Sequence, residues 1–472
     1  MNLAGFQFLT FLATAYLGWR YVVRSNQGRK NFLLVASYLF YCTWDVRFAG
    51  VLAGVTIVQW LVGARIHSAP TAGGRRAWLW VSVAAGLGCL GYFKYAGFFL
   101  GGLGEMLAGL GLQSITPIAA VAAPIGISFY TFQSLTYTID IYRGKETPTR
   151  SLRDFALFIA FFPHVTAGPI ARARLLIPQF EVDRQAIGPV DAQAVYLIVR
   201  GLTKKIAIAD VLAAHFVTPA FAEPGTWSSW FLLVAVAAYS FQIYMDLSGY
   251  TDLARGAARC FGYDLQINFD RPYLARTVSN FWQRWHISMS SFFREYLYWS
   301  IGGSKRGNVY ANLLVTFVAI GMWHGAGWNF VVYGLLHGSV VCLERVRRLA
   351  RRRRGLPDHG DTIAARILGV AYTFAFVALA RVLFVETDLQ GALEFFKLLW
   401  TGMGQGGAAG PQGYATLLVA AALHFLPRHW QQNAAQRFFA FGPVVRGAAL
   451  AAFVYVLVAV ATETRPFVYF QF

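Results

Sequence analysis

The chain has 472 residues, of which 57% are hydrophobic, 16% aromatic and only 13% charged. Soluble proteins carry about 25% charged residues, so this composition excludes a soluble globular protein and indicates a membrane protein. The formal net charge is +19, but the Lys and Arg residues lie in short segments between apolar runs. Cytoplasmic loops of membrane proteins have this distribution, so the charge predicts no nucleic-acid partner.

Apolar runs long enough to cross a bilayer follow one another along most of the chain. We predict an all-α polytopic membrane protein with about 11–12 transmembrane helices, forming one integral membrane domain over residues 1–472. The first run has no basic segment before it and no cleavage site after it, so we expect a retained helix rather than a signal peptide. The candidate spans are 5–23, 31–44, 48–66, 77–100, 115–139, 191–216, 228–247, 308–325, 328–348, 363–385, 412–427 and 446–463.

The basic segments fall on alternate connections between these spans. "RVRRLARRRR" (345–354) is the strongest of them, whereas "GGLGEMLAGLGLQS" (101–114) has no Lys or Arg. The positive-inside rule therefore places the basic loops in the cytoplasm. With twelve spans, both termini are predicted on the periplasmic side of a bacterial inner membrane.

Two segments differ from simple spans. "DFALFIAFFPHVTAGPIARARLL" (154–176) is apolar but contains Pro163, His164 and Pro169, which predicts a bent or re-entrant element packed within protein. "FWQRWHISMSSFFREYLYWSIGG" (281–303) mixes aromatic residues with Arg and Glu. This mixture is typical of a helix that lies at the membrane interface.

Several motifs typical of cofactor or metal sites are absent from the sequence, or occur where the surrounding residues exclude that function. "GLGCLG" (86–91) has dinucleotide-site spacing but lies inside an apolar span with no preceding strand, so helix packing is the better interpretation. The four cysteines have no zinc-site spacing, and no carboxylate or thiol joins the histidines at ligand spacing. We therefore predict no metal and no bound cofactor.

Polar residues within the apolar segments are the best functional candidates, because such groups are costly in lipid. His324, in "AIGMWHGAGWNF" (319–330), ends one apolar run just before the next begins. An imidazole is suited to move protons near neutral pH; a structural hydrogen bond to a helix end is the alternative. His286, His337 and Asp246 are further candidates, and each also has a structural alternative in interfacial packing, core packing or an ion pair.

Six segments in one order resemble the membrane-bound O-acyltransferase family, in particular its bacterial branch that O-acetylates alginate. They are "PIGISFYTFQSLTYTIDIYRG" (124–144), "FIAFFPHVTAGPIAR" (158–172), "YMDLSGYTDLARG" (244–256), "NFWQRWHISMSSFFREYLYWSIGG" (280–303), "GMWHGAGWNFVVYGLLHG" (321–338) and "PFVYFQF" (466–472). Several long motifs in a fixed order are far more specific than any one of them.

The resemblance implies a ring of helices and an acyl transfer in which His324 and His286 are the catalytic residues. Acetyl-CoA is the implied acyl donor, and the implied partners are periplasmic acetyltransferase proteins, the secreted exopolysaccharide and membrane lipid. Residues in the same motifs are predicted to bind substrate: Trp323, Asn329, Trp285, Arg284 and Asp246. Two alternatives stay open. One is D-alanyl transfer to teichoic acid from a carrier-protein thioester, and the other is a transporter or flippase whose substrate path is lined by His164, Asp246, His286 and His324.

Overall fold

The computed structural model describes residues 3–110, 123–166, 168–182, 191–357, 362–402, 404, 406 and 409–461. Within these residues the regular structure is helical, and the only β-type pairing is an isolated bridge between Trp227 and Gly406. Residues 1–472, predicted as one membrane domain, divide into two compact units. The first comprises Met1–Asp191 and Ala257–Gln266, and the second comprises Ala192–Gly256 and Ile267–Phe472.

Four helices of the first unit begin after a polar residue whose side chain caps them. Ser25, Asp45, Thr71 and Ser151 each accept a hydrogen bond from a backbone N–H at the start of a helix, which satisfies a donor that the helix itself leaves unpaired. The helices are α1 (Phe6–Leu17), η1 (Gly18–Val22), α2 (Asn26–Cys42), α3 (Val46–Ser68), α4 (Ala72–Leu90), η2 (Gly91–Tyr95), α5 (Ala96–Gly109), α6 (Ile127–Tyr142), α7 (Leu152–Ala160) and α8 (Ala173–Glu181).

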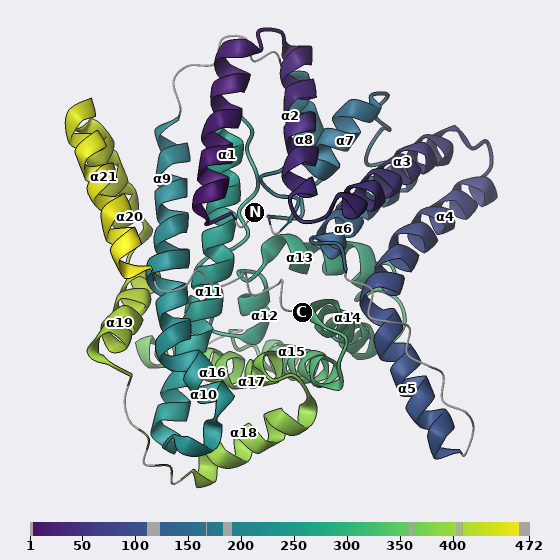
Figure 1. The fold of residues 1–472 in the computed structure, drawn as a ribbon. Coiled ribbons are helices and arrows are strands. Elements are labelled where there is room, and N and C mark those ends of the chain that lie inside the picture. Colours follow the sequence, from purple (N-terminus) through teal and green to yellow (C-terminus); the bar gives the residue numbers. More distant parts are fainter. Residues whose placement is uncertain are drawn as a thin grey trace. The chain divides into compact units, whose positions relative to one another are not determined.

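Buried polar contacts join three helices of this unit. Helices α3 and α4 lie side by side (Figure 1) and both pack on α6. Ser82 Oγ of α4 lies 2.6 Å from Gln59 Oε1 of α3 and 2.7 Å from Thr138 Oγ1 of α6. A Cβ added at Gly86 would meet Gln59 and Leu135 at 3.3 Å, so this glycine serves close helix packing, as predicted. A Cβ at Gly88 or Gly91 would meet no atom within 4 Å, so the prediction does not hold for the other two glycines of "GLGCLG".

The second unit contains the segments that carry the predicted site. Its helices are α9 (Ala192–Leu202), η3 (Thr203–Asp210), η4 (Ala213–Val217), α10 (Thr218–Ala222), η5 (Pro224–Thr226), α11 (Ser229–Cys260, in this unit up to Gly256), η6 (Pro272–Leu274), α12 (Val278–Trp282), α13 (Ile287–Phe292), η7 (Phe293–Tyr298), α14 (Val309–His324), α15 (Trp328–Arg353), α16 (Ile363–Ala380), α17 (Val382–Val385), α18 (Leu389–Thr401), α19 (Pro411–Phe425), α20 (Arg428–Ala440) and α21 (Pro443–Val460).

The prediction of an all-α polytopic membrane protein is confirmed. Six helical stretches of the described residues are long and apolar enough to cross a bilayer: Val46–Ser68, Ala72–Gly109, Ala192–Ala222, Ser229–Cys260, Ile363–Val385 and Pro443–Val460. Apolar side chains on α16 such as Ile363 and Leu368 are 76% and 69% exposed, which suits contact with lipid rather than water.

A helix also lies over each of the other predicted spans, but those helices are shorter or less apolar. Helix α1, for example, has 12 residues and α14 has 16. The first part of the predicted span 115–139 and the motif 466–472 lie outside the described residues. The apolar runs therefore predict where helices form better than they predict how many of them cross a bilayer alone.

The prediction is confirmed for one of the two unusual segments and is wrong for the other. Residues 154–176 are bent as predicted: α7 ends at Ala160, residues 161–166 and 168–172 are non-helical and buried, and α8 begins at Ala173. Residues 281–303 do not form one interfacial helix. They form the end of α12, a turn, α13 and η7, and their aromatic side chains are mostly buried, although Trp299 is 45% exposed. The mixture of aromatic and charged residues predicted a helix at the membrane interface, but protein rather than lipid headgroups covers most of these aromatic side chains.

Candidate active site

His324 lies at the end of α14, inside a tight helical hairpin. Asn308 starts the helix by accepting hydrogen bonds from the backbone N–H groups of Tyr310 and Ala311 at 2.9 and 3.3 Å. The helix ends at His324, and α15 begins four residues later at Trp328. The His324 side chain is buried, with 2% of the residue exposed, so the imidazole lies in low-dielectric surroundings.

Glycines allow the two arms of this hairpin to approach closely. A Cβ at Gly321 would overlap the Phe330 carbonyl oxygen, and a Cβ at Gly334 would overlap the Phe317 carbonyl oxygen. A Cβ at Gly325 would overlap the Phe330 ring. Only glycine leaves this space for a neighbouring backbone, so these glycines fix where α14 ends and therefore where His324 lies.

The indole of Trp323 contacts both predicted catalytic histidines. Its ring centroid lies 4.8 Å from that of His324 and 5.5 Å from that of His286. In both contacts the rings pack edge to face, with interplanar angles of 66° and 87°. Trp323 and His286 are each only 2% exposed. Two imidazoles that are 38 positions apart in the sequence therefore both contact the ring of Trp323.

His286 has an unusual backbone conformation. Its φ is 43° and its ψ is 55°, the left-handed region that costs a residue with a side chain about 1–3 kcal/mol. Asn268 stabilises the following turn, because its side-chain oxygen accepts hydrogen bonds from the Ser288 N–H and the Ser288 hydroxyl, each at 2.9 Å. The Asn268 carbonyl oxygen accepts another from the Ile287 N–H at 2.8 Å.

Burial lowers the pKa of His286 from 6.5 to about 3, because an enclosed imidazole loses the hydration that stabilises its charged form. Below about pH 6.5 the unfolded chain takes up a proton at this residue that the folded protein does not bind, so stability falls as the pH falls. We expect His286 to contribute about 1.4 kcal/mol to the loss of stability between pH 7.5 and pH 5.5. His286→Asn, which tolerates the left-handed backbone, should remove that contribution.

The measurement is the free energy of unfolding of both proteins in detergent at the two pH values. An equal loss of stability for wild type and His286→Asn would show that His286 is not held neutral by burial.

Aromatic side chains enclose His324 on its other sides. The ring centroid of Phe384, on α17, lies 4.9 Å away, and that of Tyr333, on α15, lies 6.1 Å away. Tyr333 also contacts His337, with 4.4 Å between ring centroids. Trp282 Nε1–H donates a hydrogen bond to His337 Nδ1 at 3.2 Å. The third candidate histidine therefore belongs to the same cluster, with one nitrogen engaged by an indole.

Trp285 packs against a buried guanidinium rather than against His324. Arg381 lies over the Trp285 ring at 4.4 Å from its centroid and donates a hydrogen bond to the Tyr273 hydroxyl at 2.5 Å. Phe269 links this group to the histidines, because its ring lies 5.1 Å from Trp285 and 5.9 Å from His286. Arg381 is 3% exposed and directly precedes α17, the helix that supplies Phe384.

The other predicted substrate-binding residues have protein partners. Asn329 Nδ2 donates hydrogen bonds to the carbonyl oxygens of Leu383 and Glu386 at 3.1 and 2.9 Å, so it ties the start of α15 to α17. Asp246 forms an ion pair with Lys205, with Oδ1 and Nζ 2.8 Å apart. Lys205 also pairs with Asp210 at 2.9 Å. The Asn329 side-chain oxygen, in contrast, is buried without a hydrogen-bond partner among the described residues, so substrate binding by these residues stays a prediction.

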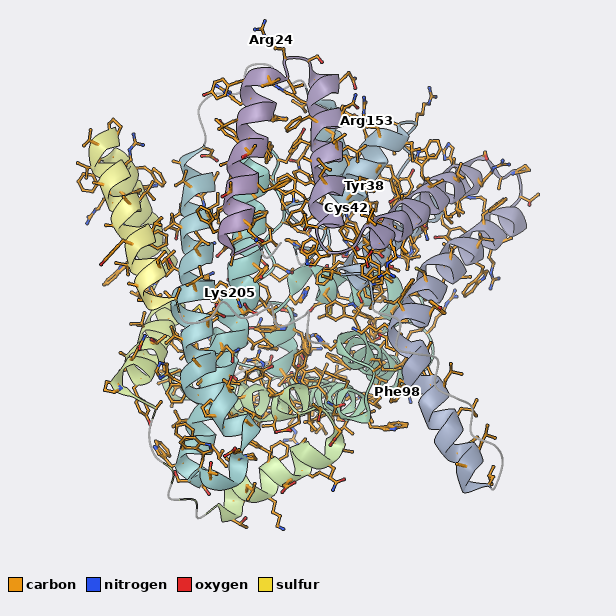
Figure 2. All side chains as sticks on the ribbon, viewed as in Figure 1. Arg24, Tyr38, Cys42, Phe98, Arg153 and Lys205 are labelled. Atoms are coloured by element: carbon orange, nitrogen blue, oxygen red, sulfur yellow. The ribbon has the colours of Figure 1, made fainter. Side chains whose placement is uncertain are left out.

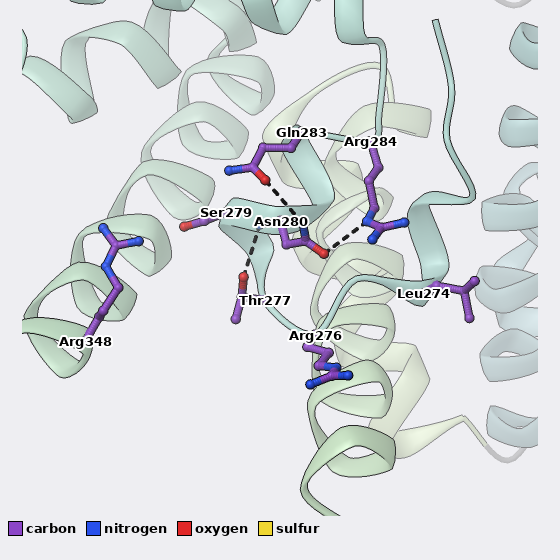
Figure 3. Close-up of a pocket in the computed structure, with 8 residues that line it drawn as sticks. All are labelled: Leu274, Arg276, Thr277, Ser279, Asn280, Gln283, Arg284 and Arg348. Atoms are coloured by element: carbon purple, nitrogen blue, oxygen red, sulfur yellow. Dashed lines mark hydrogen bonds between the residues drawn. The ribbon is translucent and has the colours of Figure 1, made fainter. Parts of the chain in front are cut away.

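Two neighbouring cavities lie beside α12 and α13. The first, of about 430 Å³, is polar and includes Arg284, the remaining predicted substrate-binding residue (Figure 3). The second, of about 380 Å³, has largely apolar walls. Ile320, one turn before His324, and Ile287, directly after His286, both line the second cavity. An elongated ligand with a polar end and a thin apolar arm would match this pair of cavities.

Three members of the cluster were not predicted: Tyr333, Phe384 and Arg381. A cation inside the otherwise apolar run 363–385 is the signal that points to Arg381. Aromatic residues are too common in this chain for Tyr333 and Phe384 to stand out. Within the described ranges no group of three His, Cys, Asp or Glu residues has the geometry to hold a metal ion.

Comparison with known proteins relates the chain to a family of membrane enzymes. Residues 127–383 match the model of the membrane-bound O-acyltransferase family. The chain is 36% identical over 403 residues to a probable alginate O-acetylase AlgI of Pseudomonas aeruginosa, which covers 84% of this chain and 74% of that protein. It is 33% identical over 418 residues to a peptidoglycan O-acetyltransferase of Helicobacter pylori, covering 82% and 77% of the two chains.

A more distant relative is a teichoic acid D-alanyltransferase of Streptococcus thermophilus. It is 28% identical over 287 residues, which cover 55% of this chain and 68% of that protein. The family match spans more than half of the chain and contains His286, Trp323 and His324. The chain therefore belongs to the membrane-bound O-acyltransferase family and is an O-acyltransferase.

Proposed function

We propose that the protein transfers an acetyl group from cytoplasmic acetyl-CoA to a hydroxyl group on the periplasmic side of the inner membrane, for O-acetylation of a secreted, alginate-like polysaccharide. A periplasmic acetyltransferase partner would receive the acetyl group or present the polysaccharide. The observation that carries the proposal is the cluster of His324, Trp323 and His286 beside the apolar cavity. Such a cavity suits the thin arm of a thioester donor. The relatives described as O-acetylating enzymes support acetyl as the acyl group.

In the proposed reaction His324 is the general base. Its imidazole takes the proton of the acceptor hydroxyl while the hydroxyl oxygen bonds to the thioester carbonyl carbon. The tetrahedral intermediate then collapses with cleavage of the carbon–sulfur bond, and the imidazolium returns the proton to the departing sulfur. The products are the O-acetyl ester and free CoA thiol. The aromatic enclosure of His324 supports this role, because excluding water from the site disfavours hydrolysis of the thioester.

His286 is the second catalytic residue of the proposal. Its backbone conformation and its position on the Trp323 ring support a role in orienting the donor, since strained residues that the surrounding structure holds in place are typical of active sites. Trp323 would set the separation of the two imidazoles. Asn329, Trp285 and Asp246 would then act through the protein, by fixing α15, Arg381 and Lys205.

Sealed membrane vesicles test both the donor and the direction of transfer. Inside-out vesicles, loaded with periplasmic extract and deacetylated polysaccharide, receive acetyl-CoA labelled in the acetyl group. We expect free CoA outside and alkali-labile label on the enclosed polysaccharide. Right-side-out vesicles given the same donor should form neither product.

Three results would contradict the proposal. Label that enters the vesicles without ester formation or CoA release would indicate a transporter. Reaction with only a D-alanyl carrier thioester would indicate D-alanyl transfer. Equal activity in vesicles of both orientations would exclude a cytoplasmic donor site.

A further inference from the structure

Arg381 is a buried cation for which the protein supplies no anion. It lies in the apolar stretch Ile363–Val385, which is long enough to cross a bilayer, and it is 3% exposed. No Asp or Glu of the described residues forms an ion pair with it. An arginine side chain stays charged in proteins, and a charge in such surroundings is costly unless it is paired. Lys205 of the same unit is paired in this way, with Asp210 and Asp246.

The guanidinium of Arg381 uses only part of its hydrogen-bonding capacity within the protein. Its Nη1 donates to the Tyr273 hydroxyl at 2.5 Å and to the Ser240 carbonyl oxygen at 3.3 Å. The group also lies over the Trp285 ring, 4.4 Å from its centroid, so these contacts hold it in one orientation. The Nε–H and Nη2–H groups donate to no acceptor within the described part of the chain. Most of the N–H donors of this side chain are therefore available to a ligand.

Other hydrogen-bonding groups without a partner lie in the same region. The hydroxyls of Tyr239, on α11, and Tyr333, on α15, have no hydrogen-bond partner among the described residues. Both tyrosines lie close enough to Arg381 for its charge to act on them. His337 contacts Tyr333, with 4.4 Å between ring centroids. Because Trp282 donates to Nδ1 of His337, the neutral imidazole carries its proton on Nε2, and this nitrogen is buried without a partner among the same residues.

We call Arg381, Tyr239, Tyr333 and His337 the donor cluster. Arg381 is 3% exposed and the two tyrosines are each 4% exposed. Their unbonded nitrogen and hydroxyl atoms are not fully enclosed by protein, in contrast to Nε2 of His337. The Tyr333 ring lies 6.1 Å from that of His324, between centroids, so one member of the donor cluster also contacts the proposed base. A ligand held by the cluster would lie beside the reacting groups.

The chemistry of the donor cluster matches a carboxylate ion. The cluster has the positive charge of Arg381 and contains no acidic residue, so it favours an anion. Arginine binds a carboxylate with two parallel hydrogen bonds, and tyrosine hydroxyls can donate to the lone pairs that remain. A phosphate monoester carries more negative charge than one guanidinium balances. A single carboxylate would neutralise Arg381 and satisfy the unused donors together.

We propose that the donor cluster binds a carboxylate of the acceptor, so that the enzyme selects an acidic, uronate-bearing polysaccharide over a neutral one. The inference rests on the proposed function, because the acceptor must reach His324. It adds the feature of the acceptor that is recognised. In a uronate the sugar ring separates the carboxylate from the ring hydroxyls, which suits two binding positions that Tyr333 links. Free acetate, the product if water attacks the thioester, has the same carboxylate chemistry and is the competing source of the ligand.

A matched pair of acceptors tests the inference. Detergent-solubilised protein with periplasmic extract receives labelled acetyl-CoA and either a deacetylated oligouronate or the same oligomer with its carboxylates converted to amides. We expect wild type to prefer the acid by at least about tenfold in kcat/KM, the effect of one charge-assisted hydrogen bond. Arg381→Gln should raise KM for the acid by about 10–100-fold with kcat unchanged, as expected when an interaction of the bound acceptor is removed. Its KM for the amide should stay at the wild-type value.

Two further variants complete this experiment. Tyr239→Phe removes one hydroxyl and keeps the ring, so it should raise KM for the acid by about 2–10-fold, the effect of one neutral hydrogen bond. Arg366→Gln is the matched control, because Arg366 is exposed on α16 and lies outside the donor cluster. Equal use of both acceptors by wild type would overturn the inference. Equal losses with both acceptors in Arg381→Gln would assign Arg381 to the fold and overturn it as well.

Direct binding distinguishes failure of this inference from failure of the proposed function. If wild type acetylated neither acceptor, the proposed function would fail, and thermal unfolding of the detergent-purified protein would still test the donor cluster. A ligand that binds only the folded protein raises its Tm. We expect the oligouronate, but not its amide, to raise the Tm of wild type and of Arg366→Gln, and to leave that of Arg381→Gln unchanged.

Two results of the binding experiment would contradict the inference. Absence of a shift with wild type would show that the donor cluster binds no carboxylate of the acceptor. A shift of the same size with sodium acetate, lost in Arg381→Gln, would assign the cluster to free acetate instead.

Discussion

Replacing His324 with alanine is expected to lower the rate of O-acetylation by roughly 10²–10⁴-fold, the usual effect of removing a positioned general base. In the proposed reaction no other group takes the hydroxyl proton, because Trp323, Phe384 and Tyr333 surround the imidazole with aromatic rings. His324→Gln should be equally inactive, since it keeps polarity and approximate size but cannot accept the proton at neutral pH. The measurement is ester-linked acetate on the secreted polysaccharide at equal abundance of the protein in the membrane.

His424→Gln is the matched control for this experiment. His424 is also buried in the second unit, at 2% exposed, and packs against Tyr244 and Tyr273; the rings that contact His324 are those of Trp323, Tyr333 and Phe384. We expect it to retain most of the activity. Wild-type levels of acetate with His324→Ala would remove His324 from the chemistry and make it a structural residue.

Replacing Lys205 with methionine is expected to destabilise the protein by about 3–5 kcal/mol, the cost of leaving buried charge without its partner. Lys205 lies on the π-helical turn η3, and Figure 2 labels it on that helix. Its ammonium group lies 2.9 Å from Asp210 and 2.8 Å from Asp246, and the three side chains are 1–5% exposed. The variant would keep two neighbouring carboxylates in low-dielectric surroundings. The free energy of unfolding in detergent is the measurement.

Asp246→Asn provides the contrast, because it leaves Lys205 with Asp210 and removes one negative charge. We expect a smaller loss of stability than for Lys205→Met, and acetylation in proportion to the folded protein. Full stability with loss of acetylation would instead show that Asp246 binds substrate, as the sequence predicts. Unchanged stability of Lys205→Met would contradict the structural role of the ion pairs.

The positions of the helices could be predicted because lipid imposes a simple rule on sequence. Spans must be apolar over their length, and every one of the twelve predicted segments carries a helix in the described residues. The segment 281–303 could not be predicted in the same way. Its aromatic residues have the same spacing whether lipid headgroups or protein cover them. The left-handed backbone conformation of His286 cannot be predicted from the amino-acid sequence around it either.

The sequence predicts the ionisable residues of the candidate site, but not the residues that hold them in position. His286 and His324 stand out as ionisable residues in apolar surroundings, and the order of the motifs relates them to a known family. Their shared contact with Trp323 depends on how α14 packs, which no local pattern specifies. The same holds for Asp246: its charge is conspicuous in the sequence, but its partner is 41 positions away on η3 and could not be identified from spacing.

In the proposed reaction, the length of α14 determines how deep in the bilayer the base lies. The helix has 16 residues and therefore measures about 24 Å, whereas the hydrocarbon layer of a bilayer is about 30 Å thick. A helix of this length that runs along the bilayer normal from the cytoplasmic boundary, as the proposed topology requires, ends several ångströms before the opposite boundary. His324, the proposed base, is its last residue. In the proposed reaction the acceptor would accordingly have to descend below the plane of the outer headgroups to meet His324.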